Sequence, residues 1–130
     1  AMNYHYTQAA TLLALLLYAG VSYNTATARG RYKVKAPAVT GNEHFERAYR
    51  VQMNTLEQLA FFLPSMWLYA ATLNDVGAAV GGAIWVVGRL IYALSYIRDP
   101  ATRSTGFTIA LVAASGLFLG AVYGVVRTMI

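Results

Sequence analysis

The chain has 130 residues, enough for one domain, and its composition is strongly apolar. Apolar residues make up 58% and charged residues 12%, whereas about 25% of residues are charged in typical soluble domains, so the composition indicates a membrane protein. The net charge of +5 does not indicate nucleic-acid binding, because the basic residues are dispersed among apolar runs. Cysteine is absent and the two histidines lie far apart, which argues against disulfides, a protein thiol nucleophile and a metal site.

The first predicted transmembrane helix spans residues 6–28, which carry no charge. At 1.5 Å per residue, a helix of this length is about 35 Å long and can cross a bilayer. Ala26-Thr27-Ala28 has the form of a signal-peptide cleavage site, but no Lys or Arg precedes the apolar run, so we favour a retained helix. A positive flank follows this helix: Arg29, Arg31, Lys33 and Lys35.

The second predicted helix, residues 43–73, begins polar and ends apolar, and Thr40 and Glu43 have the spacing of a capping box at its start. Four polar side chains recur at spacings of three, four and three and therefore share one helix face: Arg47, Arg50, Asn54 and Glu57. A charged side chain at the bilayer centre costs about 2.5–3.5 kcal/mol on insertion scales, so this face must meet protein, water or a ligand. We therefore expect it to form the floor of a site for a small, multiply charged molecule.

The third predicted helix, residues 76–97, contains one charged residue well inside the span, Arg89. Tyr92 and Tyr96 share its face at spacings of three and four. The two tyrosines fit either an aromatic belt at the membrane interface or the binding site, and the aligned arginine favours the site. Arg89 itself either contacts a ligand or forms an ion pair with Glu57.

The fourth predicted helix spans residues 100–128 and begins after Asp99-Pro100, which reads as an N-cap followed by a first-turn proline. This start places Arg103 and Ser104 in the opening turn. Gly116, Gly120 and Gly124 form a stripe of small residues at spacings of four, which is typical of close helix–helix contact.

These elements predict an all-α, single-domain integral membrane protein with four transmembrane helices. Nine of the ten basic residues lie in the half that holds the 1–2 and 3–4 connections, and only Arg127 lies in the other half. The positive-inside rule therefore predicts that these two connections are cytoplasmic and that both termini lie on the opposite side. The polar face of the second helix then opens toward the cytoplasm.

The second helix carries an ordered motif, Phe45-Glu46-Arg47-x-x-Arg50-x-Gln52-x-Asn54-x-x-Glu57, and Phe62-Leu63-Pro64 follows it. The third and fourth helices add Arg89-x-x-Tyr92-x-x-x-Tyr96 and Arg103-Ser104. This set resembles the signature of the MAPEG family, the membrane-associated proteins of eicosanoid and glutathione metabolism. The resemblance runs from about residue 28 to the middle of the fourth helix, and Gly30 and Gln58 depart from the pattern of some family members.

The resemblance implies a homotrimer of four-helix subunits that binds glutathione between neighbouring subunits. It implies that one subunit lines the site with Arg50, Asn54, Glu57, Tyr92, Tyr96, Arg103 and the adjoining Ser104. It further implies that Arg29 and Gln52 reach the site from the adjacent subunit. In this pattern Arg103 is the catalytic residue that activates the glutathione thiol.

The chemistry of glutathione agrees with this residue set. Its two carboxylates suit the guanidinium groups of Arg29 and Arg50, and its ammonium group suits Glu57, the only carboxylate deep in the polar face. Lowering a thiol pKa of about 8.5 by two units takes about 2.7 kcal/mol. A guanidinium at about 4 Å supplies about 4 kcal/mol at an effective dielectric of 20, so Arg103 alone is sufficient.

We therefore predict an integral membrane glutathione transferase that attacks lipophilic electrophiles arriving from the bilayer, a detoxification reaction. Peroxidase or isomerase activity toward lipid substrates stays open as an accompanying reaction. The main alternative is a non-catalytic lipid-binding scaffold of the same fold, against which the retained arginines and glutamate argue. A small multidrug-type transporter fits less well, because a cation pump needs an acidic pocket, and a purely structural polar network is a further alternative.

Overall fold

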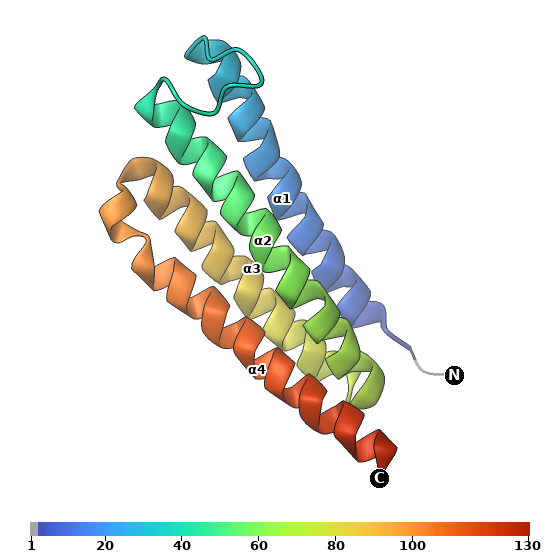
Figure 1. Cartoon of the computed structure of the whole chain (residues 1–130). Coiled ribbons are helices and arrows are strands. Elements are labelled where there is room, and N and C mark those ends of the chain that lie inside the picture. Colours follow the sequence, from blue (N-terminus) through green and yellow to red (C-terminus); the bar gives the residue numbers. More distant parts are fainter. Residues whose placement is uncertain (1–2) are drawn as a thin grey trace.

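The computed structural model describes residues 3–130, which form an antiparallel bundle of four long helices and one short 3-10 helix (Figure 1). The all-α prediction is confirmed. The elements are α1 (His5–Arg31), α2 (Glu43–Thr72), α3 (Asp75–Arg98), η1 (Pro100–Thr102) and α4 (Ser104–Met129). The expected fourth helix is divided, because η1 forms a separate turn before α4 begins.

The free N–H groups at the helix starts donate to side chains. The acceptor belongs either to the residue before the helix or to a neighbouring helix. Asn42 caps α2, since its side-chain oxygen accepts a hydrogen bond of 3.1 Å from the Phe45 backbone N–H. The expected capping box of Thr40 and Glu43 is wrong, because Asn42 lies closer to the first turn and takes the capping position. Asp75 accepts hydrogen bonds from the backbone N–H groups of Tyr6 and Thr7, so the first residue of α3 fixes the start of α1.

The bundle is centred on α2 and α3, and α1 and α4 each contact both of them. In the core, the rings of Phe62 and Trp85 stack with their centroids 4.1 Å apart. Small residues leave room for larger side chains around this core. A methyl group added at Gly81 or Gly82 would lie 2.6 Å from side-chain atoms of Leu117 or Met66, so these side chains pack directly against the α3 backbone.

Three helical segments have the length and composition of membrane spans: α1, α3, and η1 together with α4. Many large apolar side chains on their outer faces are exposed, among them Leu12, Val80 and Leu119. α2 has no stretch that is apolar enough to be identified as a membrane span in this way, because its first part is polar. However, α2 joins the end of α1 to the start of α3, and these lie at opposite ends of the bundle (Figure 1). If α1 and α3 cross a bilayer, α2 must cross it as well.

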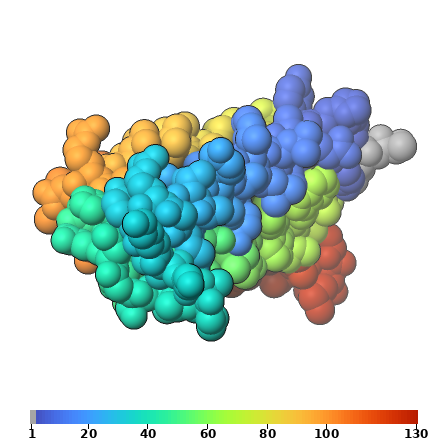
Figure 2. Space-filling model, turned by 90° about the horizontal axis from the view of Figure 1, so that it is seen from above, coloured from blue at the N-terminus to red at the C-terminus, as the bar shows by residue number. Residues whose placement is uncertain are grey.

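Both helix connections that carry the basic residues lie at one end of the molecule, and the termini lie at the other (Figure 1). Figure 2 shows the molecule from above: the α1–α2 connection (cyan to green) and the segment around η1 (orange) lie in the same half, remote from the C-terminus (red). The two connections therefore frame one end of the bundle.

Candidate functional site

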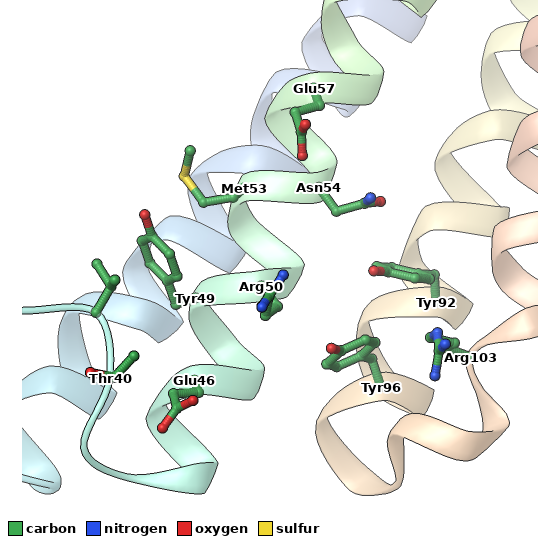
Figure 3. Close-up of a pocket in the computed structure, with 11 residues that line it drawn as sticks. Thr40, Glu46, Tyr49, Arg50, Met53, Asn54, Glu57, Tyr92, Tyr96 and Arg103 are labelled. Atoms are coloured by element: carbon green, nitrogen blue, oxygen red, sulfur yellow. The ribbon is translucent and has the colours of Figure 1, made fainter.

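A cavity of about 610 Å³ lies at this end, bounded by α2, α3 and the start of α4 (Figure 3). From α2, Arg50, Asn54 and Glu57 line it, and Figure 3 shows them facing Tyr92 and Tyr96 of α3. The full set of lining residues is Val39, Thr40, Glu46, Tyr49, Arg50, Met53, Asn54, Glu57, Tyr92, Tyr96 and Arg103. Six of the residues implied by the family resemblance thus meet in one cavity.

The α2 wall follows from helical periodicity, because Arg50, Asn54 and Glu57 recur once per turn. Arg47, the fourth residue of the predicted polar face, does not line the cavity. It forms an ion pair with Glu43, and its Nη1 donates to the carbonyl oxygens of Ile97 and Arg98, both at 3.4 Å. Arg47 therefore joins the start of α2 to the end of α3.

The opposite wall holds two tyrosines and an arginine. The ring centroids of Tyr92 and Tyr96 are 5.6 Å apart, and the guanidinium carbon of Arg103 lies 5.9 Å from the Tyr96 ring centroid. Nη1 of Arg103 donates to the Pro100 carbonyl oxygen at 2.8 Å, so the backbone of η1 holds this side chain. α4 begins at Ser104 rather than at the expected residue 100, so Ser104 lies in its opening turn and Arg103 directly precedes it.

Ser104 lines an adjoining hollow of about 470 Å³ rather than the main cavity. Asn54, Tyr92 and Arg103 line both spaces, so the two spaces share one wall. A ligand held against Arg50 and Glu57 would therefore have Ser104 on the far side of Arg103, next to the second hollow.

Arg89 does not line the cavity. Its side chain is 1% exposed, Nη2 donates to Thr55 Oγ1 at 2.8 Å, and the guanidinium carbon lies 4.1 Å from the Tyr92 ring centroid. Of the two roles left open for Arg89, the ion pair with Glu57 is not formed, because the only ion pair within residues 3–130 joins Arg47 and Glu43. The reason is helix rotation: Thr55 faces α3, whereas Glu57, two residues farther along, faces the cavity.

Arg29 and Gln52 do not line the cavity of their own chain. Nη1 of Arg29 donates to the carbonyl oxygens of Val34 (3.1 Å) and Ala38 (2.7 Å), and its guanidinium carbon lies 4.7 Å from the Phe45 ring centroid. Gln52 is half-buried on a different face of α2. Their expected contribution from a neighbouring subunit stays a prediction.

Five of the lining residues were not among the sequence candidates: Val39, Thr40, Glu46, Tyr49 and Met53. Glu46 lies four residues before Arg50 and Met53 three residues after it, so helical periodicity could have found these two. Tyr49 directly precedes Arg50 and shares no such spacing with it. Gly106 has no sequence signal of this kind. A methyl group at Gly106 would lie 2.7 Å from the Gly88 carbonyl oxygen and still closer to the Tyr92 backbone nitrogen, so Gly106 allows α4 to begin directly against α3.

The cavity combines both signs of charge, with two arginines and two glutamates along its walls: Arg50, Arg103, Glu46 and Glu57. In addition, Oδ1 of Asn54 is buried and has no hydrogen-bond partner within residues 3–130. A buried acceptor without a donor is costly, so a donor supplied by a bound molecule would stabilise it. The site thus suits a small molecule with carboxylate and ammonium groups.

Comparison with known proteins identifies the family. The model of the MAPEG family matches residues 7–123. An uncharacterized protein of Synechocystis sp. is 45% identical over 115 residues, which cover 88% of this chain and 84% of that protein. Microsomal glutathione S-transferase 2 of Homo sapiens is 38% identical over 84 residues, which cover 65% of this chain and 57% of that protein.

Leukotriene C4 synthase of Bos taurus is 36% identical over 93 residues, which cover 72% of this chain and 62% of that protein. The aligned part is thus less than two thirds of the length of these two named relatives. The family model nevertheless covers most of the chain, and three of its helical segments have the length and hydropathy of membrane spans. We conclude that the chain belongs to the MAPEG family and is an integral membrane protein.

Proposed function

We propose that this chain is an integral membrane glutathione transferase. Its relatives include a glutathione transferase and a leukotriene C4 synthase, which supports a glutathione-related function in a membrane. One observation carries the proposal: guanidinium, carboxylate and phenol groups from α2, α3 and the start of α4 meet in a single cavity of about 610 Å³. This volume lies within the range of about 300–1,000 Å³ that is usual for small-molecule sites.

In the proposed complex, Arg50 binds a glutathione carboxylate through two parallel N–H groups. Glu57 pairs with the ammonium group, and Oδ1 of Asn54, which has no other partner within residues 3–130, accepts a hydrogen bond from it. Tyr92 and Tyr96 supply further hydrogen bonds from the opposite wall. These contacts hold glutathione equally in the ground state and in the transition state.

Arg103 stabilises the thiolate, which is the reactive form of the thiol. The thiol proton leaves to solvent, the sulfur electron pair forms a bond with the electrophilic carbon, and the leaving group or opened ring takes the electrons of the broken bond. The position of Arg103 before α4 adds the partial positive charge of a helix N-terminus. The lipophilic electrophile arrives from the bilayer beside α1 and α4.

The site is completed, in this proposal, by Arg29 and Gln52 of an adjacent subunit in a homotrimer. The family resemblance and the absence of both residues from the cavity of their own chain support this arrangement. The glycine stripe of α4 does not, because Gly120 and Gly124 pack against Tyr69 and Thr72 of the same chain. Native mass spectrometry from detergent tests the trimer, and a monomer with full turnover would contradict it.

We further propose that the cavity opens toward the cytoplasm and that both termini lie on the opposite side. The concentration of basic residues at the end that holds the two connections supports this orientation. Single cysteines introduced at Lys35 or Thr102 should react only with reagents that enter the cell. Labelling of these positions by an impermeant reagent outside intact cells would reverse the topology.

The decisive experiment is ultraviolet thiolate absorbance on addition of glutathione to the purified protein in detergent. We expect thiolate to form near neutral pH and to be consumed when a lipophilic electrophile is added, with appearance of the conjugate. S-methylglutathione, which has no ionisable thiol, is the control. Binding of glutathione without thiolate or conjugate would favour the alternative of a non-catalytic lipid-binding scaffold. A lipid hydroperoxide in place of the electrophile tests for peroxidase activity in the same assay.

A further inference from the structure

A second hollow lies on a different face of the bundle, between α1 and α3. It has a volume of about 460 Å³, and the ten residues that line it include none that line the glutathione cavity. Nine of these residues have no polar side chain, and the exception is Asn24. Leu16 and Leu94, on opposite walls, are 69% and 60% exposed, so the hollow is an open apolar groove rather than part of the core.

Gly20 creates space along the α1 wall of this groove. A methyl group added at Gly20 would meet no atom within 4 Å, so no other side chain within residues 3–130 fills the space beside it. On the α3 wall the groove runs from Val86 to Ile97, which corresponds to about 16 Å along the helix. This length is close to half of the hydrocarbon core of about 30 Å, that is, to one leaflet.

The groove leads to two exposed arginines. α1 and α3 are parallel and both end where the helix connections lie (Figure 1). Arg31 follows Asn24 by seven residues, or about two turns, and Arg98 follows Leu94 by one turn, so both continue the helix faces that line the groove. Neither guanidinium forms an ion pair with any part of the chain that the structure describes.

We propose that this groove binds one anionic phospholipid of the adjacent leaflet. An acyl chain lies in the groove beside Gly20, Asn24 hydrogen-bonds to the ester region, and the phosphate binds Arg31 and Arg98. Two guanidiniums at the head-group level attract a lipid with net negative charge more strongly than a zwitterionic one. This inference does not depend on the glutathione chemistry.

The charges at the end of the groove argue against a helix as its occupant. A second copy of the chain would have to supply carboxylates opposite both Arg31 and Arg98. A single acyl chain with an acidic head group satisfies both the narrow apolar groove and the charges at its end.

Native mass spectrometry of delipidated protein, titrated with phosphatidylglycerol or phosphatidylcholine of the same acyl chains, tests the proposal. We expect one phosphatidylglycerol per chain to bind first and to raise the unfolding temperature more than phosphatidylcholine does. The double variant Arg31→Gln/Arg98→Gln should lose about thirtyfold of the affinity for phosphatidylglycerol and little of that for phosphatidylcholine. The matched control is Lys33→Gln/Lys35→Gln, which removes the same charge outside the groove and should keep the preference.

Gly20→Leu tests the groove itself, because the position is open to an added side chain, and a larger one there should reduce binding of both lipids. Gly116→Leu is its control, since an added methyl group there also meets no atom within 4 Å and the position lies outside the groove. Equal affinity of the unaltered protein for the two lipids would overturn the proposal. So would a preference for phosphatidylglycerol that survives the arginine substitutions, or lipid binding unchanged by Gly20→Leu.

Discussion

The contact between α2 and α3 has two halves that differ in packing and in chemistry. Toward the termini it is filled: Phe62 stacks on Trp85, and Met66 lies against Gly82. Toward the helix connections it is hollow, and charged side chains of α2 face Tyr92 and Tyr96 across the cavity. In the filled half, side chains of Leu117 and Met66 occupy the space beside Gly81 and Gly82 of α3. Close packing therefore builds the scaffold at one end and leaves room for a ligand at the other.

The border between the halves is a buried polar contact. Arg89 donates to Thr55, and the Thr55 hydroxyl donates in turn to the Val51 carbonyl oxygen at 2.7 Å. Arg89 also lies against the ring of Tyr92, the first α3 residue of the cavity. The buried guanidinium of Arg89 therefore links Thr55 of α2 to the ring of Tyr92 in the cavity wall.

If the halves are functionally separate, substitutions in the hollow half change chemistry and those in the filled half change stability. The largest effect is expected for Arg103→Leu. Loss of the cation returns the thiol pKa toward its usual value of about 8.5, so turnover at neutral pH falls about a hundredfold and activity reappears as the pH rises.

The measurement is kcat against pH at saturating glutathione in one detergent, with Arg103→Lys as the variant that retains the charge. Thermal unfolding of both variants must match that of the unaltered protein, because lost folding would imitate lost catalysis. Turnover at the original level with an unshifted pH profile would show that Arg103 is not the activating residue. Tyr92, Tyr96 or Ser104 would then be the next candidates.

Glu57→Gln and Arg50→Ala are expected to have the next largest effect, on binding rather than on chemistry. A hydrogen bond between charged groups is worth about 1.5–3 kcal/mol, so each change should weaken glutathione binding about ten- to hundredfold. Since these contacts are equal in the ground and transition states, kcat at saturation should change little. Isothermal titration measures the affinity, and Glu43→Gln, which alters an α2 carboxylate outside the cavity, is the control. Unchanged affinity would remove these two side chains from the site.

Gly106→Ala tests whether the hollow half depends on the packing of α4 against α3. The added methyl group would lie 2.7 Å from the Gly88 carbonyl oxygen and closer to Tyr92, so the start of α4 must shift and take Arg103 with it. We expect a loss of about 1–3 kcal/mol in stability, typical of overpacking, and a lower kcat. Gly116→Ala meets no atom within 4 Å and is the matched control. Equal behaviour of the two variants would contradict the proposed dependence.

The sequence predicted what depends on local periodicity. Uncharged runs located α1 and α4, and spacings of three and four located Arg50, Asn54 and Glu57 on one wall and Tyr92 with Tyr96 on the other. These features follow from the geometry of a single helix.

What the sequence could not predict depends on how two segments meet. The partner of Arg89 depends on the rotation of α2, which turns Thr55 rather than Glu57 toward α3. The contacts of Arg29 depend on the course of the α1–α2 connection, whose carbonyl oxygens bind it. Gly106 is required only because α3 lies directly against it. None of these relations has a spacing signal within one helix.

The smallest effect is expected for Trp67→Phe, which tests the filled half alone. Nε1 of Trp67 donates to Thr11 Oγ1 at 3.0 Å and joins α2 to α1, far along α2 from the cavity residues. The Thr11 hydroxyl keeps its own bond to the Thr7 carbonyl oxygen, so the change removes one hydrogen bond without leaving a buried donor unpaired. Such a bond between membrane helices is worth about 0.6 kcal/mol on average. We therefore expect a small decrease in the unfolding temperature in detergent, with glutathione affinity, kcat and the pH profile unchanged. A change in any of these three without a change in stability would show that the two halves are coupled, and the separation drawn from their packing would then be wrong.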